Sequence, residues 1–173
     1  HDIGGIVGLA FAITHPDKVK SLTIMDTTFF SDYQWHATAK IWRKPIIGEL
    51  AMYLMGRKQF TDAMKKGAPI LTDAQVQSNY DSLTFANRRM ILRFYRALDP
   101  RIFKQWEDQL QVVAKRFPTQ VIWGENDTFL PVKNSTRFGT DNVHILEHTG
   151  HWPMLEQAEK VQKLIRDNIA LAG

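Results

Sequence analysis

The sequence predicts an α/β fold, in which a parallel sheet flanked by helices is interrupted by an inserted, entirely helical segment. Short apolar segments at 19–25, 118–124 and 142–146 have the length and composition of buried parallel strands. Residues 29–116 instead show helical spacing with no convincing strand. A helix that leads into a strand within a few residues is typical of right-handed crossovers, which favours a parallel sheet.

Local sequence signals define the ends of the predicted helices. Residues 4–14 form a predicted helix of mostly small, apolar residues, and His15-Pro16 ends it because the residue before proline avoids helical dihedrals. In the middle segment, Thr72 followed by Gln75 is a capping-box signal for a further helix. The chain closes with an amphipathic helix over 156–171.

Composition excludes several classes of protein. The 173 residues carry a net charge of +4, but lysine and arginine are spread out, so we expect no nucleic-acid partner. No apolar run is long enough to cross a bilayer, and we expect no membrane partner. The absence of cysteine excludes disulfides and thiolate metal sites but leaves the compartment open, with a cytoplasmic location favoured.

The most informative motif stands at the first residues. His1-Asp2-Ile3-Gly4-Gly5 leads straight into the first predicted helix. This pattern is typical of the second half of a nucleophile elbow, a sharp strand-to-helix turn that lifts one side chain above a sheet. Asp2 is then the candidate nucleophile. The strand that carries it is expected before residue 1, so we interpret the chain as the C-terminal portion of a larger enzyme.

Two further polar residues follow predicted strands. Asp127 comes after the strand 118–124, and His151 lies beyond the strand 142–146. Chemistry in an open α/β sheet gathers at the carboxyl ends of the strands, so Asp2, Asp127 and His151 are expected to converge. A carboxylate nucleophile would form an ester, the histidine would activate water, and the second carboxylate would orient the imidazole. Two rivals stay open: Asp26 as the orienting acid and His148 as the base.

Three motifs in this order resemble the α/β-hydrolase superfamily, in the branch with an aspartate nucleophile. They are His1-Asp2-Ile3-Gly4-Gly5, the segment 123–131 that holds Asp127, and Gly150-His151-Trp152-Pro153. The branch comprises epoxide hydrolases, haloalkane dehalogenases and haloacetate dehalogenases. The resemblance implies that the backbone N–H of Ile3 helps to form an oxyanion hole. It also implies a missing part of four or five leading strands, so a complementary N-terminal segment of the same protein is an expected partner.

Within this branch the residues favour epoxide hydrolysis. Haloalkane and haloacetate dehalogenases place Trp or Arg after the nucleophile, where this chain has Ile3. Epoxide hydrolases use cap tyrosines that donate to the epoxide oxygen, and Tyr95 and Tyr33 are similar in position to these. Trp35 and His36 instead resemble an aromatic residue and a histidine of the haloacetate dehalogenase cap, so dehalogenation remains the alternative.

The remaining expectations concern substrate, cofactor and domains. The substrate is expected to be a small, apolar to moderately polar electrophile, contacted by Ile3, Tyr33, Trp35, His36 and Trp152. No metal-ligand spacing is visible, and the mechanism needs no cofactor. Residues 1–28 and 117–173 are predicted to form the α/β-hydrolase core, and residues 29–116 the helical cap.

The residues favour two other functions less. A non-catalytic, ligand-binding member of the same fold is possible, although the presence of Asp2, Asp127 and His151 argues against it. A serine-type esterase is disfavoured because the elbow position holds no serine.

Overall fold

The computed structural model describes residues 1–173, which form two compact units. The sheet unit comprises His1–Tyr33 and Arg101–Gly173, and the helical unit comprises Gln34–Pro100. The helical unit is therefore shorter than the predicted cap over 29–116.

Aromatic packing explains this difference at the boundary. Phe29 is fully buried and stacks on Phe103 and Trp106, with ring centroids 4.8 and 5.8 Å apart. The backbone N–H of Ser31 donates to the Glu107 carboxylate over 2.5 Å. These contacts join residues that follow the first strand to residues 103–107, so both segments belong with the sheet.

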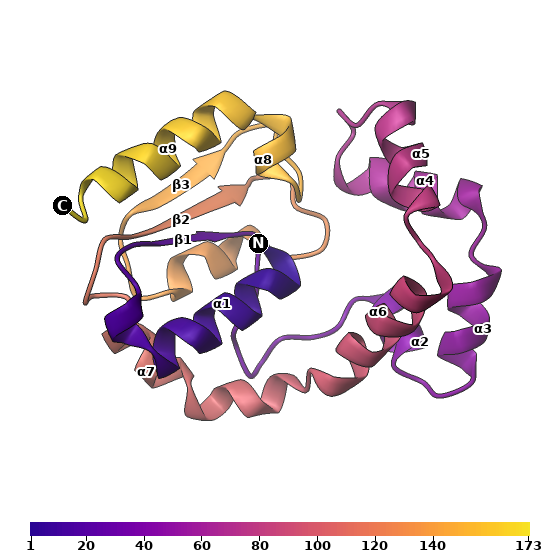
Figure 1. The fold of residues 1–173 in the computed structure, drawn as a ribbon, viewed down its shortest axis with the longest axis horizontal. Coiled ribbons are helices and arrows are strands. Elements are labelled where there is room, and N and C mark those ends of the chain that lie inside the picture. The colour runs from indigo at the N-terminus through magenta and orange to yellow at the C-terminus, as the bar shows by residue number, and fades with distance from the viewer. The chain divides into compact units, whose positions relative to one another are not determined.

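Three parallel strands form the sheet, in the order β1-β2-β3 (Figure 1). They are β1 (Leu22–Met25), β2 (Thr119–Gly124) and β3 (Val143–Leu146). The central strand β2 is buried along its whole length, as its apolar sequence requires. The predicted α/β fold with a parallel sheet is thus confirmed.

Helices cover both faces of this sheet (Figure 1). On one face lie α1 (Asp2–Thr14) and α7 (Glu107–Val113), which contact each other. On the other lie α8 (Pro153–Glu156) and α9 (Ala158–Ala170). Short 3-10 helices at Pro16–Lys18, Pro100–Gln105 and Val132–Arg137 complete the unit.

The α9 helix shows how its sequence selects the packed face. Val161 is buried in a cluster with Ile122 and Leu146, and Leu164 and Ile165 pack against that cluster. The i, i+3, i+4 spacing of these residues places them on one stripe of the helix. Ile169, in the last turn, is largely exposed.

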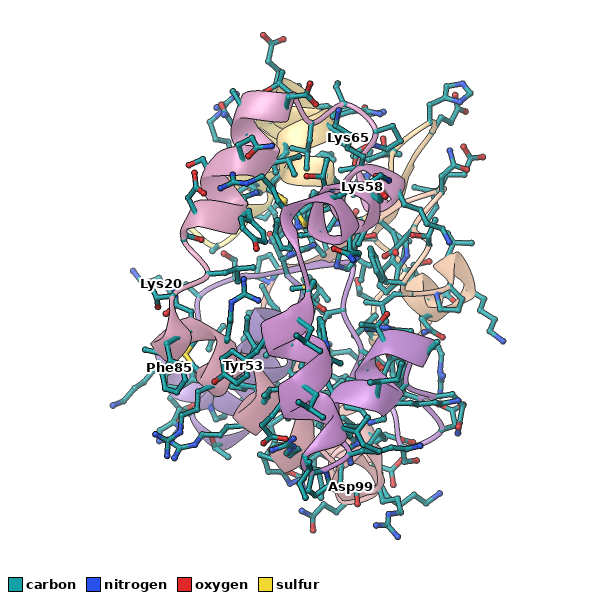
Figure 2. The ribbon with its side chains drawn as sticks, turned by 90° about the vertical axis from the view of Figure 1, so that its right-hand side faces the viewer. Lys20, Tyr53, Lys58, Lys65, Phe85 and Asp99 are labelled. Atoms are coloured by element: carbon teal, nitrogen blue, oxygen red, sulfur yellow. The ribbon has the colours of Figure 1, made fainter.

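The helical unit contains five α-helices and no strand, as its sequence predicts. Thr72 and Gln75 form the predicted capping box at the start of α5. Tyr53 and Phe85 stack at a centroid distance of 5.3 Å and face solvent (Figure 2). No helix of the structure combines the length and the apolar character needed to cross a membrane. The five helices are α2 (Ala37–Trp42), α3 (Ile47–Leu54), α4 (Arg57–Gly67), α5 (Asp73–Asp81) and α6 (Phe85–Ala97).

Candidate active site

The candidate nucleophile lies in a strained turn. Asp2 is the first residue of α1 and has a φ of 46°, a left-handed conformation that non-glycine residues rarely adopt. Its backbone is held from both sides, because its N–H donates to the Asp26 carbonyl (3.1 Å) and its carbonyl accepts from Thr27 Oγ1 (2.5 Å). A Cβ on Gly5 would collide with the Thr27 side chain, which explains the small residue there. A left-handed residue at the start of a helix, with small residues beside it, is one feature of a nucleophile elbow.

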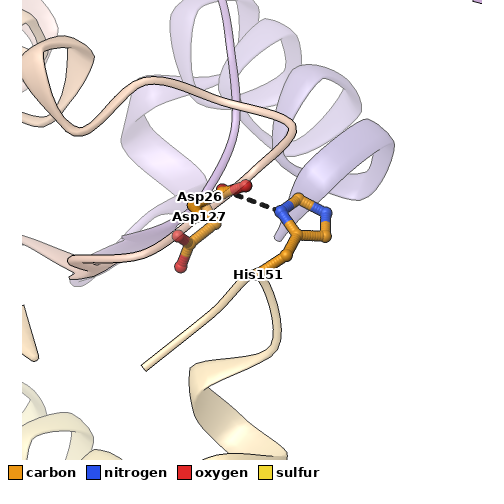
Figure 3. A group of neighbouring side chains, drawn as sticks. All are labelled: Asp26, Asp127 and His151. Carbon is orange, nitrogen blue, oxygen red and sulfur yellow. Dashed lines mark hydrogen bonds and ion pairs between the residues drawn. The ribbon is translucent and has the colours of Figure 1, made fainter. Parts of the chain in front are cut away.

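Three predicted residues meet above the strand ends. His151 Nδ1 lies 2.8 Å from Asp127 Oδ2 (Figure 3), and His151 Nε2 lies 3.9 Å from Asp2 Oδ1. The Asp127 side chain is fully buried and that of His151 nearly so, whereas 47% of the Asp2 side chain is exposed. The His151 and Asp127 side chains are thus shielded from solvent, while the carboxylate of Asp2, the candidate nucleophile, is accessible.

Backbone donors fix the Asp127 carboxylate. Its Oδ1 accepts from the N–H groups of Phe129 (2.7 Å) and Leu130 (3.0 Å), as an aspartate does in a turn. Its Oδ2 remains for the imidazole, which therefore carries its proton on Nδ1 and leaves Nε2 as the acceptor facing Asp2. Of the two acids weighed from sequence, Asp127 is the one bonded to His151.

Aromatic rings surround the imidazole of His151. Trp152 and Phe129 pack edge-on against it, with centroids 4.8 and 5.0 Å away, and the His1 ring lies at 4.8 Å. His1 Nε2 also donates to the His151 carbonyl over 2.7 Å. The sequence named Trp152 but missed Phe129 and His1 as site residues, although both stand within the quoted motifs.

Gly124 is a third residue that the sequence did not assign to the site. It ends β2, and a Cβ there would collide with the backbone carbonyls of Thr149 and Gly150, just before His151. Its N–H donates to Asp26 Oδ1 over 3.0 Å. A glycine is therefore needed for the His151 loop to pass close to the end of β2.

The other histidine candidate does not join the site. His148 is exposed, has a φ of 55°, and uses its backbone N–H to bond the Glu125 carboxylate. Asp26, Asp127 and His151 each offer one ligand atom within 4.8 Å of the others, but Nδ1 of His151 and Oδ2 of Asp127 are already bonded to each other. We therefore assign no metal to this group.

Two further predicted residues lie in the sheet unit. Burial, and then the negative charges of Asp2 and Asp127, raise the pKa of the Tyr33 phenol to about 12. It therefore stays protonated at ordinary pH and can donate. Ile3 is the second residue of α1, where a backbone N–H has no intrahelical acceptor and is available to an oxyanion.

The remaining predicted residues gather within the helical unit. Tyr95, on α6, packs its ring against Trp35 (5.3 Å), Trp42 (5.2 Å) and, edge-on, His36 (6.2 Å). Nδ1 of His36 accepts from the Ala39 N–H and so caps α2. The structure thus brings Trp35, His36 and Tyr95 into one aromatic cluster and gives His36 a structural task as well.

Comparison with known proteins identifies related chains. Residues 1–158 match the model of a family described as alpha/beta hydrolase fold. A 2-hydroxy-6-oxononadienedioate/2-hydroxy-6-oxononatrienedioate hydrolase from Paraburkholderia xenovorans is 28% identical over 98% of this chain and 60% of its own length. The hydrolase of the same name from Cupriavidus pinatubonensis is 29% identical over 96% of this chain and 59% of its own length. The chain thus spans about three fifths of these relatives.

Solved structures agree in fold. A meta-cleavage product hydrolase from Pseudomonas fluorescens IP01 superimposes with a TM-score of 0.75 at 15% identity, covering 100% of this chain and 64% of that one. An enol-lactonase from Burkholderia xenovorans LB400 gives 0.63 at 18% identity, covering 98% and 63%. These relatives are named for chemistry other than the epoxide hydrolysis and dehalogenation expected from sequence.

Proposed function

The chain belongs to the alpha/beta hydrolase fold family, and on that premise we propose that it carries the catalytic residues of a hydrolase with an aspartate nucleophile. The observation that carries this proposal is that the three side chains Asp127, His151 and Asp2 are neighbours in this order. His151 Nδ1 bonds Asp127, and Nε2 faces the Asp2 carboxylate at 3.9 Å. The elbow position holds a carboxylate rather than a hydroxyl, so no proton has to be removed from the nucleophile before it attacks.

In the first step, an Asp2 carboxylate oxygen attacks an electrophilic carbon of the substrate. A carbon–oxygen bond forms to give an ester on Asp2, and the bond from that carbon to its leaving group breaks. The exposure of the Asp2 side chain leaves the attacking oxygen accessible. The left-handed backbone at Asp2 sets the direction in which the carboxylate projects.

In the second step, His151 Nε2 takes a proton from water, which attacks the carbonyl carbon of the Asp2 ester. The Ile3 N–H is placed to stabilise the oxyanion. When this intermediate collapses, the alcohol leaves with one of the original Asp2 oxygens, and the water oxygen stays in the Asp2 carboxylate. Asp127 offsets the charge of the imidazolium that forms.

Among electrophiles, we favour epoxides. Opening an epoxide produces an alkoxide that needs a proton donor, whereas a halide leaves without one. The phenol of Tyr33, which stays protonated beside Asp2 and Asp127, supports such a donor in the sheet unit. Tyr95 remains our second proposed donor from the helical unit, and its aromatic neighbours Trp35 and His36 are proposed to contact the substrate.

The names of the relatives favour a second candidate, the hydrolysis of C–C or ester bonds at a carbonyl carbon. An aspartate that attacks such a carbon would form an anhydride instead of an alkyl ester. Dehalogenation stays the alternative that the sequence left open. If no covalent adduct ever forms on Asp2, the remaining candidate is a protein of this fold that binds a ligand without catalysing a reaction.

We also propose that a complementary polypeptide segment of the same protein covers one side of the sheet unit. On α1, Val7 and Phe11 are about half exposed, and a Cβ added at Gly4 or Gly8 would meet nothing. Strand β1 pairs with β2 alone, which leaves its other edge open to a further strand. Native mass spectrometry of the protein from its source would show whether such a segment accompanies this chain.

Single turnover in heavy-oxygen water tests the proposed mechanism. Enzyme in excess over an epoxide should give an unlabelled diol and a heavy oxygen in the peptide that contains Asp2. Hydrolysis by direct attack of water would instead label the diol and leave Asp2 unlabelled. Ester and 1-haloalkane substrates, run in parallel, decide between the three substrate classes.

The variant His151→Gln provides the second arm. Without the base, the Asp2 ester should persist and appear as a mass increase equal to one substrate. His144→Gln is the matched control, because His144 lies in β3 and is bonded to neither Asp2 nor Asp127. Normal turnover by His151→Gln, with no trapped adduct, would contradict the proposal.

A further inference from the structure

Asp26 is a buried carboxyl that the proposed mechanism does not use. It follows β1, is fully buried and has a φ of 32°. Its Oδ1 accepts from the Gly124 N–H, but its Oδ2 is buried with no donor facing it. Burying a carboxylate oxygen without a hydrogen-bond donor raises the free energy of the folded state, so the state of this atom requires an explanation.

The neighbours of Asp26 are mainly acidic. Asp127 lies beside it (Figure 3), and ligand atoms of Asp26, Asp127 and His151 are within 4.8 Å of one another. Glu156, at the end of α8, adds a further negative charge. Two adjacent buried carboxyls are rarely both ionised, because their charges repel in a medium of low dielectric.

The hydrogen bonds decide which of the two carboxyls carries a proton. Asp127 accepts from two backbone N–H groups and from His151 Nδ1, three donors that all favour its charged form. Asp26 accepts from the single N–H of Gly124. The proton therefore belongs on Asp26, where it makes the carboxyl group a donor, and the neighbouring Asp127 carboxylate is the acceptor within reach.

We propose that Asp26 is a positioning residue that remains protonated and donates its O–H to Asp127, thereby holding that carboxylate against His151. This inference rests on the proposed function only in giving His151 the part of general base. The placement of the proton depends on the geometry of the sheet unit alone. Asp26 thus contacts neither substrate nor the reacting atoms and acts through Asp127.

A pH dependence follows. Burial, and then the nearby Asp127 charge, raise the pKa of Asp26 from 3.8 to about 9. Between these values the folded protein holds a proton that the unfolded chain has lost, so Asp26 lowers the stability progressively as the pH rises through this window. Above the folded-state pKa, Asp26 ionises, its O–H is lost, and Asp127 gains a repulsive neighbour.

Infrared spectroscopy of the whole chain tests where the proton lies. At neutral pH we expect a C=O stretch of a protonated carboxylic acid, which disappears with a midpoint near the pKa of about 9. Asp26→Asn should lack this band, whereas Asp17→Asn should keep it, since the Asp17 side chain is 87% exposed and paired with Arg116. A band that is absent at neutral pH, or that survives in Asp26→Asn, overturns the proposal. If Asp26→Asn does not fold, the titration of the wild-type band alone still decides.

Turnover tests the positioning role separately. Asparagine keeps an acceptor for Gly124 and a neutral donor for Asp127, so Asp26→Asn should change kcat by less than about threefold and should abolish the alkaline fall in kcat. Asp26→Ala removes the donor and should lower kcat by about tenfold or more at neutral pH, with KM little changed. Equal loss of kcat in both variants would overturn the role of the O–H. If the C=O band behaves as expected but the protein shows no turnover, the proposed function is refuted. The assignment of the proton to Asp26 would still hold.

Discussion

The sheet unit buries many polar side chains, several of which bond to one another, whereas Arg88 is the one buried polar side chain of the helical unit. Asp26, Asp127 and His151 are almost completely shielded and linked to backbone groups or to each other. In the helical unit, Ile46 and Leu54 are about three quarters exposed. Both units expose large apolar side chains, so the buried polar network is what distinguishes the sheet unit.

Backbone strain follows the same division. Four non-glycine residues have positive φ, and three of them, Asp2, Asp26 and His148, lie at turns of the sheet unit next to the strand ends. Ile46 is the fourth and lies at a turn of the helical unit. Strain persists where surrounding bonds over-determine the conformation, as the bonds to Asp26 and Thr27 do at Asp2.

The largest effect is expected from Asp127→Asn. The asparagine amide would donate to His151 Nδ1, which places the imidazole proton on Nε2 and removes the base. Turnover should fall by about 10²- to 10⁴-fold, with the Asp2 ester accumulating. Asp17→Asn, at an exposed ion pair with Arg116, should leave kcat unchanged. Stopped-flow kinetics and intact mass measure both, and a fall without accumulated ester would place the defect in the first step.

Gly124→Ala should destabilise the sheet unit. The new Cβ would meet the carbonyls of Thr149 and Gly150, and the His151 loop would have to move, at a cost of about 1–3 kcal/mol. For this chain by itself, Gly8→Ala is the matched control, because a Cβ at that helical position meets nothing and alanine favours helix. Urea unfolding measures both variants. A Gly124→Ala protein as stable as the wild type would show that the close approach is not required.

A smaller effect is expected at the support of the elbow. Thr27→Val removes the hydroxyl that donates to the Asp2 carbonyl over 2.5 Å, a loss of about 1 kcal/mol, and loosens the backbone that aims the nucleophile. Thr27→Ser keeps the hydroxyl and should retain the rate of ester formation. Comparing the rate of the burst phase with the free energy of unfolding distinguishes a loss of Asp2 positioning from a loss of protein stability. Equal rates in the two variants would show that the hydroxyl does not position Asp2.

The smallest effect is predicted in the helical unit, and it has the opposite sign. Ile46 has a φ of 68° and a ψ of −57° in a γ-turn closed by the Ile47 N–H on the Pro45 carbonyl. Ile46→Gly should relieve this strain and, after the entropic cost of glycine, stabilise the protein by about 0.5 kcal/mol. Ile47→Gly, at a helical position, should destabilise by a similar amount. Thermal unfolding measures the stability of both variants, and turnover is expected to stay unchanged. Destabilisation by Ile46→Gly would mean that the turn is not strained.

Local sequence patterns determined a large part of this protein. Apolar runs set the strands, the capping box of Thr72 and Gln75 set the start of α5, and the spacing of Val161, Leu164 and Ile165 set the packed face of α9. The motifs also placed Asp2, Asp127 and His151 at strand ends. These signals can be read because each depends on residues within a few positions of one another.

Tertiary structure alone decided which of the candidate groups meet. Only folding brings Asp127 to His151, 24 residues away, or sets Thr27 under the carbonyl of Asp2. It also decided that the helical unit starts at Gln34, because Phe29 packs against aromatic rings that lie far along the chain and belong to the sheet unit. The physical reason is that hydrogen bonds, desolvation and ring packing between distant segments depend on where the sheet brings them together. The proton that we assign to Asp26 is an example, because it depends on a neighbour that no local pattern names.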